Sequence, residues 1–159
     1  MPPRKRVMIS ILLFIFLGIG AASHIPAAEK QNVLVLHSYH QEFPWTDSIM
    51  QGVRAVFKQT SIPVELYVEY MDVKRHRTGG SFPILASLYA YRYERIDFDV
   101  IILSDDFALD FVLNHRQKIF AGVPIVFCGI NNYSDSRLAG HHNITGVAED
   151  IDLNGNVQG

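Results

Sequence analysis

The chain has 159 residues, 48% of them hydrophobic, with 14 Lys and Arg against 16 Asp and Glu and a net charge of −2. Residues 1–28 hold three of the basic residues and no acidic residue, so the rest of the chain has 11 basic against 16 acidic residues and a net charge of −5. This acidic balance argues against a nucleic acid as the partner. The single cysteine, Cys128, excludes a disulfide within the chain.

The N-terminal segment is typical of an exported protein. A basic cluster, Arg4 to Arg6, precedes an apolar run over residues 7–22, as in a secretory signal peptide. The run is shorter than the ~20 residues of a typical spanning helix, so residues 1–28 are expected to be either a cleaved signal peptide or a retained membrane anchor. Both outcomes predict a periplasmic or extracytoplasmic location for the remainder. If residues 7–22 are retained, they anchor it in the inner membrane.

The exported part begins with alternating strand and helix patterns. The continuous apolar run over 33–36 predicts a strand that is buried on both faces. A helix is expected to follow Pro44, with Thr46 or Asp47 as its cap. Its apolar face consists of residues at helical spacing: Ile49, Val53, Val56 and Phe57. Residues 64–70 alternate between apolar and polar side chains, which predicts a strand near the edge of the sheet.

The same alternation continues along the rest of the chain. The remaining predicted elements are a helix from Ser81 to about Glu94, a buried strand over 100–103, a helix with Leu109, Val112, Leu113 and Phe120 on its apolar face and Gly122 as its stop, a strand over 124–128 and an extended segment over 144–149. Strands that alternate with helices predict an α/β fold, a doubly wound parallel sheet with helices on both faces. Residues 29–159 are long enough for one domain with its own core.

Polar side chains gather where the predicted strands end. In an open parallel sheet, ligands bind outside the carboxyl ends of the strands, where the strand order reverses. The candidate ligand-binding residues are Ser38, Tyr39, His40, Trp45, Asp72, Ser104, Asp105, Asp106, Asn131 and Asn132. Carboxylates can accept hydrogen bonds from a ligand's amine or hydroxyl groups, and the neutral side chains can orient it. The indole of Trp45 can stack on a planar ligand.

Each assignment has a structural alternative. An Asp at the start of a helix, here Asp105 or Asp106, is also an ordinary N-cap. The Ser and Asn side chains after the strands are common in turns. Trp45 can instead form a hydrophobic staple that fixes the entry to the first helix.

Motifs of catalysis are missing from the sequence. The chain contains no G-x-G-x-x-G or G-x-x-x-x-G-K-[ST] phosphate loop and no G-x-S-x-G nucleophile elbow. His37 and His40 have the H-x-x-H spacing of a metal pair, but alternation at a strand end separates their side chains. We therefore expect no enzymatic activity from this chain, no cofactor and no metal.

Several stretches resemble one known family. The stretches "NVLVLHSYHQEFPWTDSIMQGV", "VEYMD", "DVIILSDDFALDFV", "VPIVFCGINNY" and "NITGVAEDID" are similar to the N-terminal lobe of the ABC-transporter substrate-binding family, which has a type I periplasmic-binding fold. The similarity runs from Asn32 to Leu153. The stretches "HSYHQEFPWTD" and "SDDFALDF" resemble the version found as the extracytoplasmic sensor region of bacterial membrane histidine kinases.

The resemblance implies a two-lobed clamp that closes on a small ligand by hinge motion. Some members of the family are similar to aromatic amino-acid binders. Carried over by position, the ligand-facing residues are Ser38, Tyr39, Asp105, Asp106, Asn131 and Asn132. The C-terminal lobe of that fold and any kinase module are missing from the sequence, so residues 29–159 are expected to be a truncated N-terminal lobe.

Two functions remain open at this point. The first is the sensory input of a membrane histidine kinase in two-component signalling, in which a ligand acts by shifting a lobe equilibrium. The alternative is the substrate-binding component of an ABC transporter for a small solute such as an amino acid. The expected partners are a small-molecule ligand, the second lobe, the membrane, and a kinase module or an ABC permease.

Overall fold

The computed structural model describes residues 28–76, 81–131 and 133–149 of the chain. These residues form one five-stranded sheet in which all neighbouring strands are parallel. In their order across the sheet, the strands are β2 (Val64–Tyr70), β1 (Gln31–His37), β3 (Val100–Ser104), β4 (Ile125–Ile130) and β5 (Ile144–Ala148). The predicted α/β fold with a parallel sheet is confirmed.

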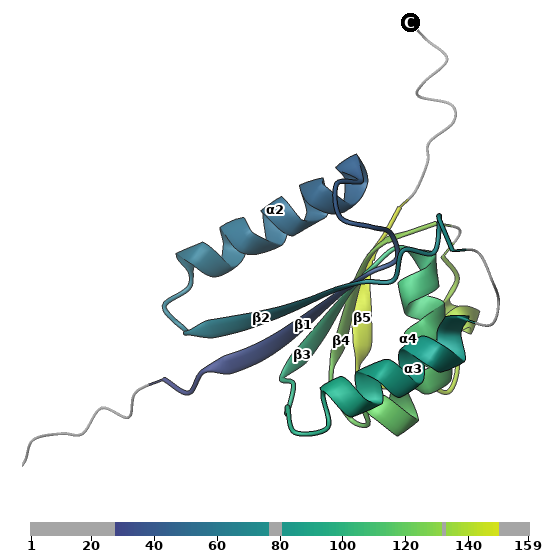
Figure 1. The fold of residues 1–159 in the computed structure, drawn as a ribbon. Coiled ribbons are helices and arrows are strands. Elements are labelled where there is room, and N and C mark those ends of the chain that lie inside the picture. Colours follow the sequence, from purple (N-terminus) through teal and green to yellow (C-terminus); the bar gives the residue numbers. More distant parts are fainter. Residues whose placement is uncertain (1–27, 77–80, 132, 150–159) are drawn as a thin grey trace, which may run out of the picture.

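Helices lie on both faces of the sheet (Figure 1). On one face lies α2 (Pro44–Gln59), and on the other lie α3 (Ser81–Arg92) and α4 (Asp106–Ile119). A short 3-10 helix, η1 (Asp135–Leu138), connects β4 to β5. The sequence did not predict η1, because four residues without a repeating apolar pattern carry no helical signal.

Side-chain alternation along the strands produces two hydrophobic clusters of unequal size. Leu34 and Leu36 of β1 belong to a large cluster with α3 and α4, whereas Val33 and Val35 belong to a small cluster with Met50 of α2. Every residue of β2 is only partly buried. This agrees with the place of β2 at the edge of the sheet, as its alternating sequence predicted.

The start of α2 differs from the prediction. The helix begins at Pro44, and the residue before it, Phe43, takes the cap position without a side-chain hydrogen bond. Neither Thr46 nor Asp47 is the cap. Proline suits the first helical position because its φ is already helical and the N–H that it lacks has no partner there. Thr46 is buried within the first turn, and Asp47 Oδ1 accepts a hydrogen bond from the Glu42 N–H at 3.1 Å.

The buried face of α2 is also shifted from the predicted one. Val56 is exposed, and Met50 is buried instead, beside Val53 and Phe57. Met50, Val53 and Phe57 follow i, i+3, i+7 spacing and share one face. Val56 is six residues from Met50, which places it about 120° from Met50 around the helix axis. The predicted apolar face of this helix therefore included an exposed residue, Val56.

Strand β4 runs two residues further than predicted, to Ile130. Gly129 lies inside the strand with a φ of 67°, and the pairing with β5 shifts register between Cys128 and Ile130. A bulge of this kind favours glycine, which adopts positive φ without steric cost. The glycine that suggested the end of the strand instead bends it. The other boundaries differ from the predicted ones by one or two residues.

The predicted signal peptide or membrane anchor cannot be located in this structure. Residues 7–22 lie outside the described part of the chain. In residues 28–76, 81–131 and 133–149, no helix has the length and apolar character needed to cross a membrane.

Candidate functional site

The strand order reverses between β1 and β3. The chain passes from β1 to β2 on one side and then returns to β3 on the other side of β1. At this switch point His37 at the end of β1 is paired with Ser104 at the end of β3. Ligands of open parallel sheets bind at such a point, outside the carboxyl ends of the strands. We call this end of the sheet the carboxyl edge, and the predicted site residues that follow the strands lie along it.

Ser38 and Ser104 hold the carboxyl edge together. Both are buried. The Ser38 hydroxyl donates a hydrogen bond to the Ser104 carbonyl at 2.8 Å and accepts one from the Ala108 N–H at 2.8 Å. The Ser104 hydroxyl lies 2.7 Å from His37 Nδ1. These contacts join β1, β3 and the first turn of α4, so both serine hydroxyls have partners inside the protein.

Asp105 is a buried carboxylate at the switch point. It is 6% exposed and is the N-cap residue of α4, with its Oδ1 accepting a hydrogen bond from the Asp106 N–H at 2.7 Å. The sequence left open whether Asp105 caps the helix, and it does. Burial raises the pKa of the Asp105 carboxyl, while a hydrogen bond from Tyr39 and the nearby charge of Lys74 oppose this rise.

The backbone of Asp105 is strained. Its φ is 73° and its ψ is 165°, a region that is occupied essentially by glycine. A non-glycine residue there costs on the order of 1–3 kcal/mol, and such residues cluster at functional sites. A glycine would adopt this conformation without that cost, but it would not supply the carboxylate.

Asp106 belongs to a polar network that joins the start of α4 to Asn131 and Arg137. Its Oδ2 accepts hydrogen bonds from the Asn131 backbone N–H at 3.2 Å and from Asn131 Nδ2 at 3.1 Å. Its Oδ1 forms an ion pair with Arg137, which also reaches Asp110 Oδ1 at 2.7 Å. Burial alone would raise the pKa of the Asp106 carboxyl, but the hydrogen bonds from Arg137 and Asn131 outweigh it, and the pKa is lowered.

Arg137 is a residue that sequence reasoning missed. It belongs to η1, 31 positions after Asp106. Its neighbourhood in the sequence is a polar loop without periodicity, so no local signal connects it to the start of α4. Its place beside Asp106 and Asp110 is known only from the fold.

A cation and two aromatic rings lie next to Asp105. Lys74, in the loop after β2, places its Nζ 4.2 Å from the ring centre of Tyr39 and 4.0 Å from that of Phe43. The two rings meet edge to face with centres 5.1 Å apart. Tyr39 was a predicted site residue, whereas Lys74 and Phe43 were not. A basic loop after a strand is common, and the sequence does not show which ring its lysine will contact.

Trp45 lies over the end of β4. It is 38% exposed, and a Cβ built on Gly129 would lie 2.9 Å from Trp45 Cζ2. The indole therefore lies directly against the backbone of the β4 bulge, and it connects the first turn of α2 to β4. Its exposed part remains available for stacking on a planar molecule.

Asp72 organises a second polar group at the end of β2. Its carboxylate lies 2.9 Å from Arg75 Nε, 3.5 Å from His40 Nδ1 and 3.6 Å from His76 Nε2. His40 and His37 thus have different partners and do not form a pair. Within the described ranges, no group of three or more His, Cys, Asp or Glu side chains is arranged to hold a metal ion.

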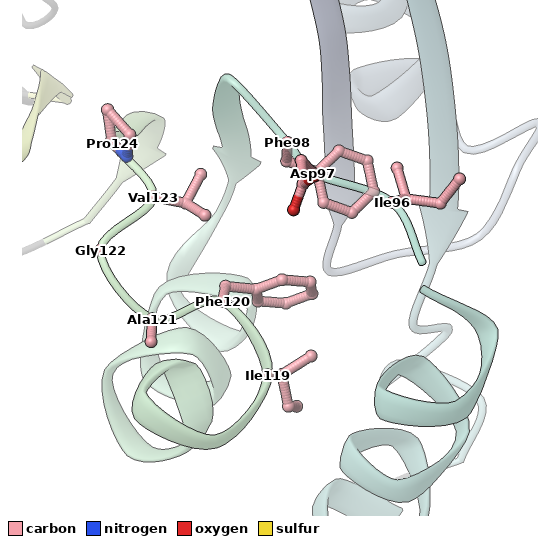
Figure 2. A pocket seen from close by; sticks show the side chains of 9 residues that line it. All are labelled: Ile96, Asp97, Phe98, Ile119, Phe120, Ala121, Gly122, Val123 and Pro124. Atoms are coloured by element: carbon pink, nitrogen blue, oxygen red, sulfur yellow. The ribbon is translucent and has the colours of Figure 1, made fainter. Parts of the chain in front are cut away.

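A cavity of about 440 Å³ lies at the opposite end of the sheet. It opens between the loops that precede β3 and β4 (Figure 2), and the rings of Phe98 and Phe120 meet edge to face there, with centres 6.0 Å apart. None of the predicted site residues lines it. The residues that line it carry no polar side chain apart from the acidic Asp97.

The structure thus brings together nine of the ten predicted site residues along the carboxyl edge, and Asn132 lies outside the described residues. Ser38, Ser104 and Asp106 are held by contacts within the protein, and Asp105 accepts hydrogen bonds from the Asp106 N–H and from Tyr39. Tyr39, Trp45 and Asp105, together with Lys74 and Phe43, form the part of the edge best suited to meet a ligand. Comparisons with family models, curated proteins and solved structures return no match.

Proposed function

We propose that residues 29–159 are one lobe of an extracytoplasmic small-molecule-binding domain of the type I periplasmic-binding kind, and that this domain is the sensory input of a membrane histidine kinase. The observation that carries the proposal is Asp105. A buried carboxylate in a strained backbone, placed at the switch point of a parallel sheet, matches the pattern of a ligand-binding residue.

The chemistry of the carboxyl edge suggests the class of ligand. Asp105 can accept hydrogen bonds from an ammonium or hydroxyl group, and Lys74 can pair with an anionic group. Tyr39, Phe43 and the exposed part of Trp45 provide aromatic surface for a planar or apolar portion. A small polar molecule with both a donor and an anionic group, such as an amino acid, satisfies all of these residues.

Binding by the purified full chain in detergent micelles tests this proposal. Titration calorimetry against a panel of amino acids and small carboxylates should find at least one ligand. For that ligand, Asp105→Asn and Lys74→Gln should each weaken binding by about tenfold or more, because each removes a hydrogen bond to a charged group.

Asp97→Asn provides a matched control. Asp97 is an exposed carboxylate at the opposite end of the sheet, so its loss should leave the affinity unchanged. The proposal fails if no compound of this class binds, or if Asp97→Asn weakens binding as much as Asp105→Asn does.

The fate of residues 1–28 separates the sensor from the transport alternative. A sensor keeps its apolar segment, so the full-length chain should be recovered in the membrane fraction. A transport receptor is released, so a soluble product with an N-terminus near Glu29 should appear in the periplasm. N-terminal sequencing of both fractions distinguishes the two functions, and a released product would overturn the sensor assignment.

A further inference from the structure

His37 lies beneath the first turn of α2. Side chains alternate along β1, so His37 points to the same face of the sheet as Val33 and Val35. That face packs against Met50 of α2. Thr46 is buried one turn before Met50, on the same side of the helix. Figure 1 shows that α2 starts at the carboxyl edge and runs back along the sheet, so its first turn covers the end of β1.

The first turn of α2 lacks interactions that normally hold the start of a helix. Phe43, at the cap position, makes no side-chain hydrogen bond, although a capping side chain stabilises a helix. Thr46 is the buried residue of this turn. Within the residues that the structure describes, the Thr46 hydroxyl and His37 Nε2 are buried without a hydrogen-bond partner. Buried polar groups are normally paired, and unpaired ones cost stability. Both atoms lie between β1 and α2, so opening this layer to water relieves both costs.

Protonation of His37 would add a charge to the same layer. Its neighbours on the other strands are neutral: Nδ1 lies 2.7 Å from the Ser104 hydroxyl, and the ring stacks on Tyr70. Asp47 of α2 is the charged group that acts on the ring, and its effect is smaller than that of burial, which lowers the pKa of His37 to about 4. The ordinary pKa of 6.5 returns when the ring meets water. Acid therefore favours any opening that exposes His37.

We propose that the first turn of α2 is an acid-released gate of the carboxyl edge: when His37 is protonated, the turn leaves the sheet together with the rings of Phe43 and Trp45. These two rings belong to the surface assigned to the ligand, so the loss of ligand in acid rests on the proposed function. The opening itself does not. Between pH 6.5 and about 4, acidification should raise the ratio of open to closed chains by up to about two orders of magnitude.

Fluorescence of the full 159-residue chain in detergent micelles tests the opening. Trp45 is the only tryptophan, and its indole lies against Gly129 of β4, so its emission reports the separation of the turn from the sheet. On acidification without ligand, the wild-type emission should shift to longer wavelength between pH 6.5 and about 4, before circular dichroism shows loss of the helices. His37→Gln should keep its neutral-pH emission until the whole chain unfolds.

A second variant tests the turn without removing the histidine. Thr46→Val replaces the unpaired hydroxyl with a methyl group of similar size, which stabilises the closed turn. The emission change should therefore move to lower pH. The matched control is Thr60→Val at the other end of α2, where the side chain is exposed. It should leave the midpoint of the emission change where it is in wild type.

Three outcomes would overturn the proposal. If the wild-type emission changes only together with the loss of helical signal, acid unfolds the whole chain and does not open the turn. If His37→Gln shows the same emission change as wild type, His37 is not the group that opens it. If Thr46→Val and Thr60→Val have the same midpoint, the first turn of α2 is not the moving part. All these measurements are made without ligand, so they stand apart from the calorimetric test of the carboxyl edge.

Discussion

At the scale of single residues, His37 combines full burial with a titratable ring. Its Nδ1 lies 2.7 Å from the Ser104 hydroxyl, and its ring stacks on Tyr70 with centres 5.2 Å apart. Its Nε2 meets no hydrogen-bonding group in the part of the chain that the structure describes. Burial lowers the pKa of His37 to about 4, against a small opposing effect from Asp47.

This burial predicts a loss of stability in acid. His37 stays neutral in the folded chain down to a pKa of about 4, whereas its ordinary pKa of 6.5 applies when the chain unfolds. Between these two pKa values, His37 therefore binds a proton in the unfolded chain but not in the folded chain. The stabilisation is complete above about pH 6.5 and is lost as the pH falls toward 4.

Replacement of the ring should flatten this pH dependence. His37→Gln should remove up to about 3 kcal/mol of the change in unfolding free energy between neutral and acid pH. Urea unfolding of wild type and variant at several pH values measures it, with His142→Gln, an exposed histidine, as the control. If the unfolding free energies of wild type and His37→Gln fall equally as the pH is lowered, groups other than His37 cause the loss of stability in acid.

The strain at Asp105 makes a second prediction at the residue scale. Asp105→Gly and Asp105→Ala both remove the carboxylate, but only glycine tolerates a φ of 73° and a ψ of 165°. Asp105→Gly should therefore be more stable than Asp105→Ala by about 1–2 kcal/mol. Both variants should lose the proposed ligand. Denaturant unfolding compares them, and equal stability would show that the backbone is not strained at this position.

At the scale of the elements, the bulge of β4 and the start of α2 are fitted to each other. Gly129 has no side chain, and its backbone lies against the Trp45 ring. Gly129→Ala would place a Cβ 2.9 Å from Trp45 Cζ2 at a φ of 67°. We expect this variant to lose about 1–3 kcal/mol of stability and to displace the indole.

The indole itself reports the result, because Trp45 is the only tryptophan in the chain. Gly129→Ala should shift its fluorescence emission to longer wavelength. The control is Gly52→Ala in α2. A Cβ at this position meets nothing within 4 Å, and the substitution should raise the stability of the helix by up to about 1 kcal/mol. An unchanged emission spectrum in Gly129→Ala would show that the two elements are not in contact.

At the scale of the whole molecule, the two faces of the sheet differ in how firmly their helices are held. The fully buried residues on the α2 side are Val33, Val35 and Met50. The side of α3 and α4 holds a much larger cluster, which includes Leu103, Leu109 and Phe111. Burial of apolar area is the main source of stability, so α2 should open more readily than α4.

Native-state hydrogen exchange tests this difference. The amides of α2 should exchange through local opening of low free energy, whereas those of α4 and of the central strands β1 and β3 should exchange only with global unfolding. Mass spectrometry of peptides from each element provides the rates. Equal protection of α2 and α4 would contradict the expected difference between the two faces.

The elements were predicted well because their signals are local. Apolar runs at 33–36 and 100–103 and alternation at 64–70 are visible within a few residues, and they fell inside β1, β3 and β2. The gathering of polar residues at one edge followed from the same pattern, since parallel strands place their carboxyl ends together. Two predictions about α2 were wrong for equally local reasons. The helix begins at Pro44 because proline suits the first helical position, so neither Thr46 nor Asp47 is the cap. Val56 is exposed because the buried face of the helix is centred nearer to Met50.

The contacts that distinguish one polar residue from another were not predictable in this way. The sequence determined that Ser38, Tyr39, Asp105 and Asp106 lie at strand ends. Only the tertiary structure decided that Ser38 is enclosed between β3 and α4, that Asp106 is held by Arg137, and that Tyr39 and Lys74 meet beside Asp105. The hydrophobic periodicity that predicts strands and helices is a property of residues close together in the sequence. These partnerships join residues that are about 30 to 70 positions apart, and only the packing of the layers brings them together.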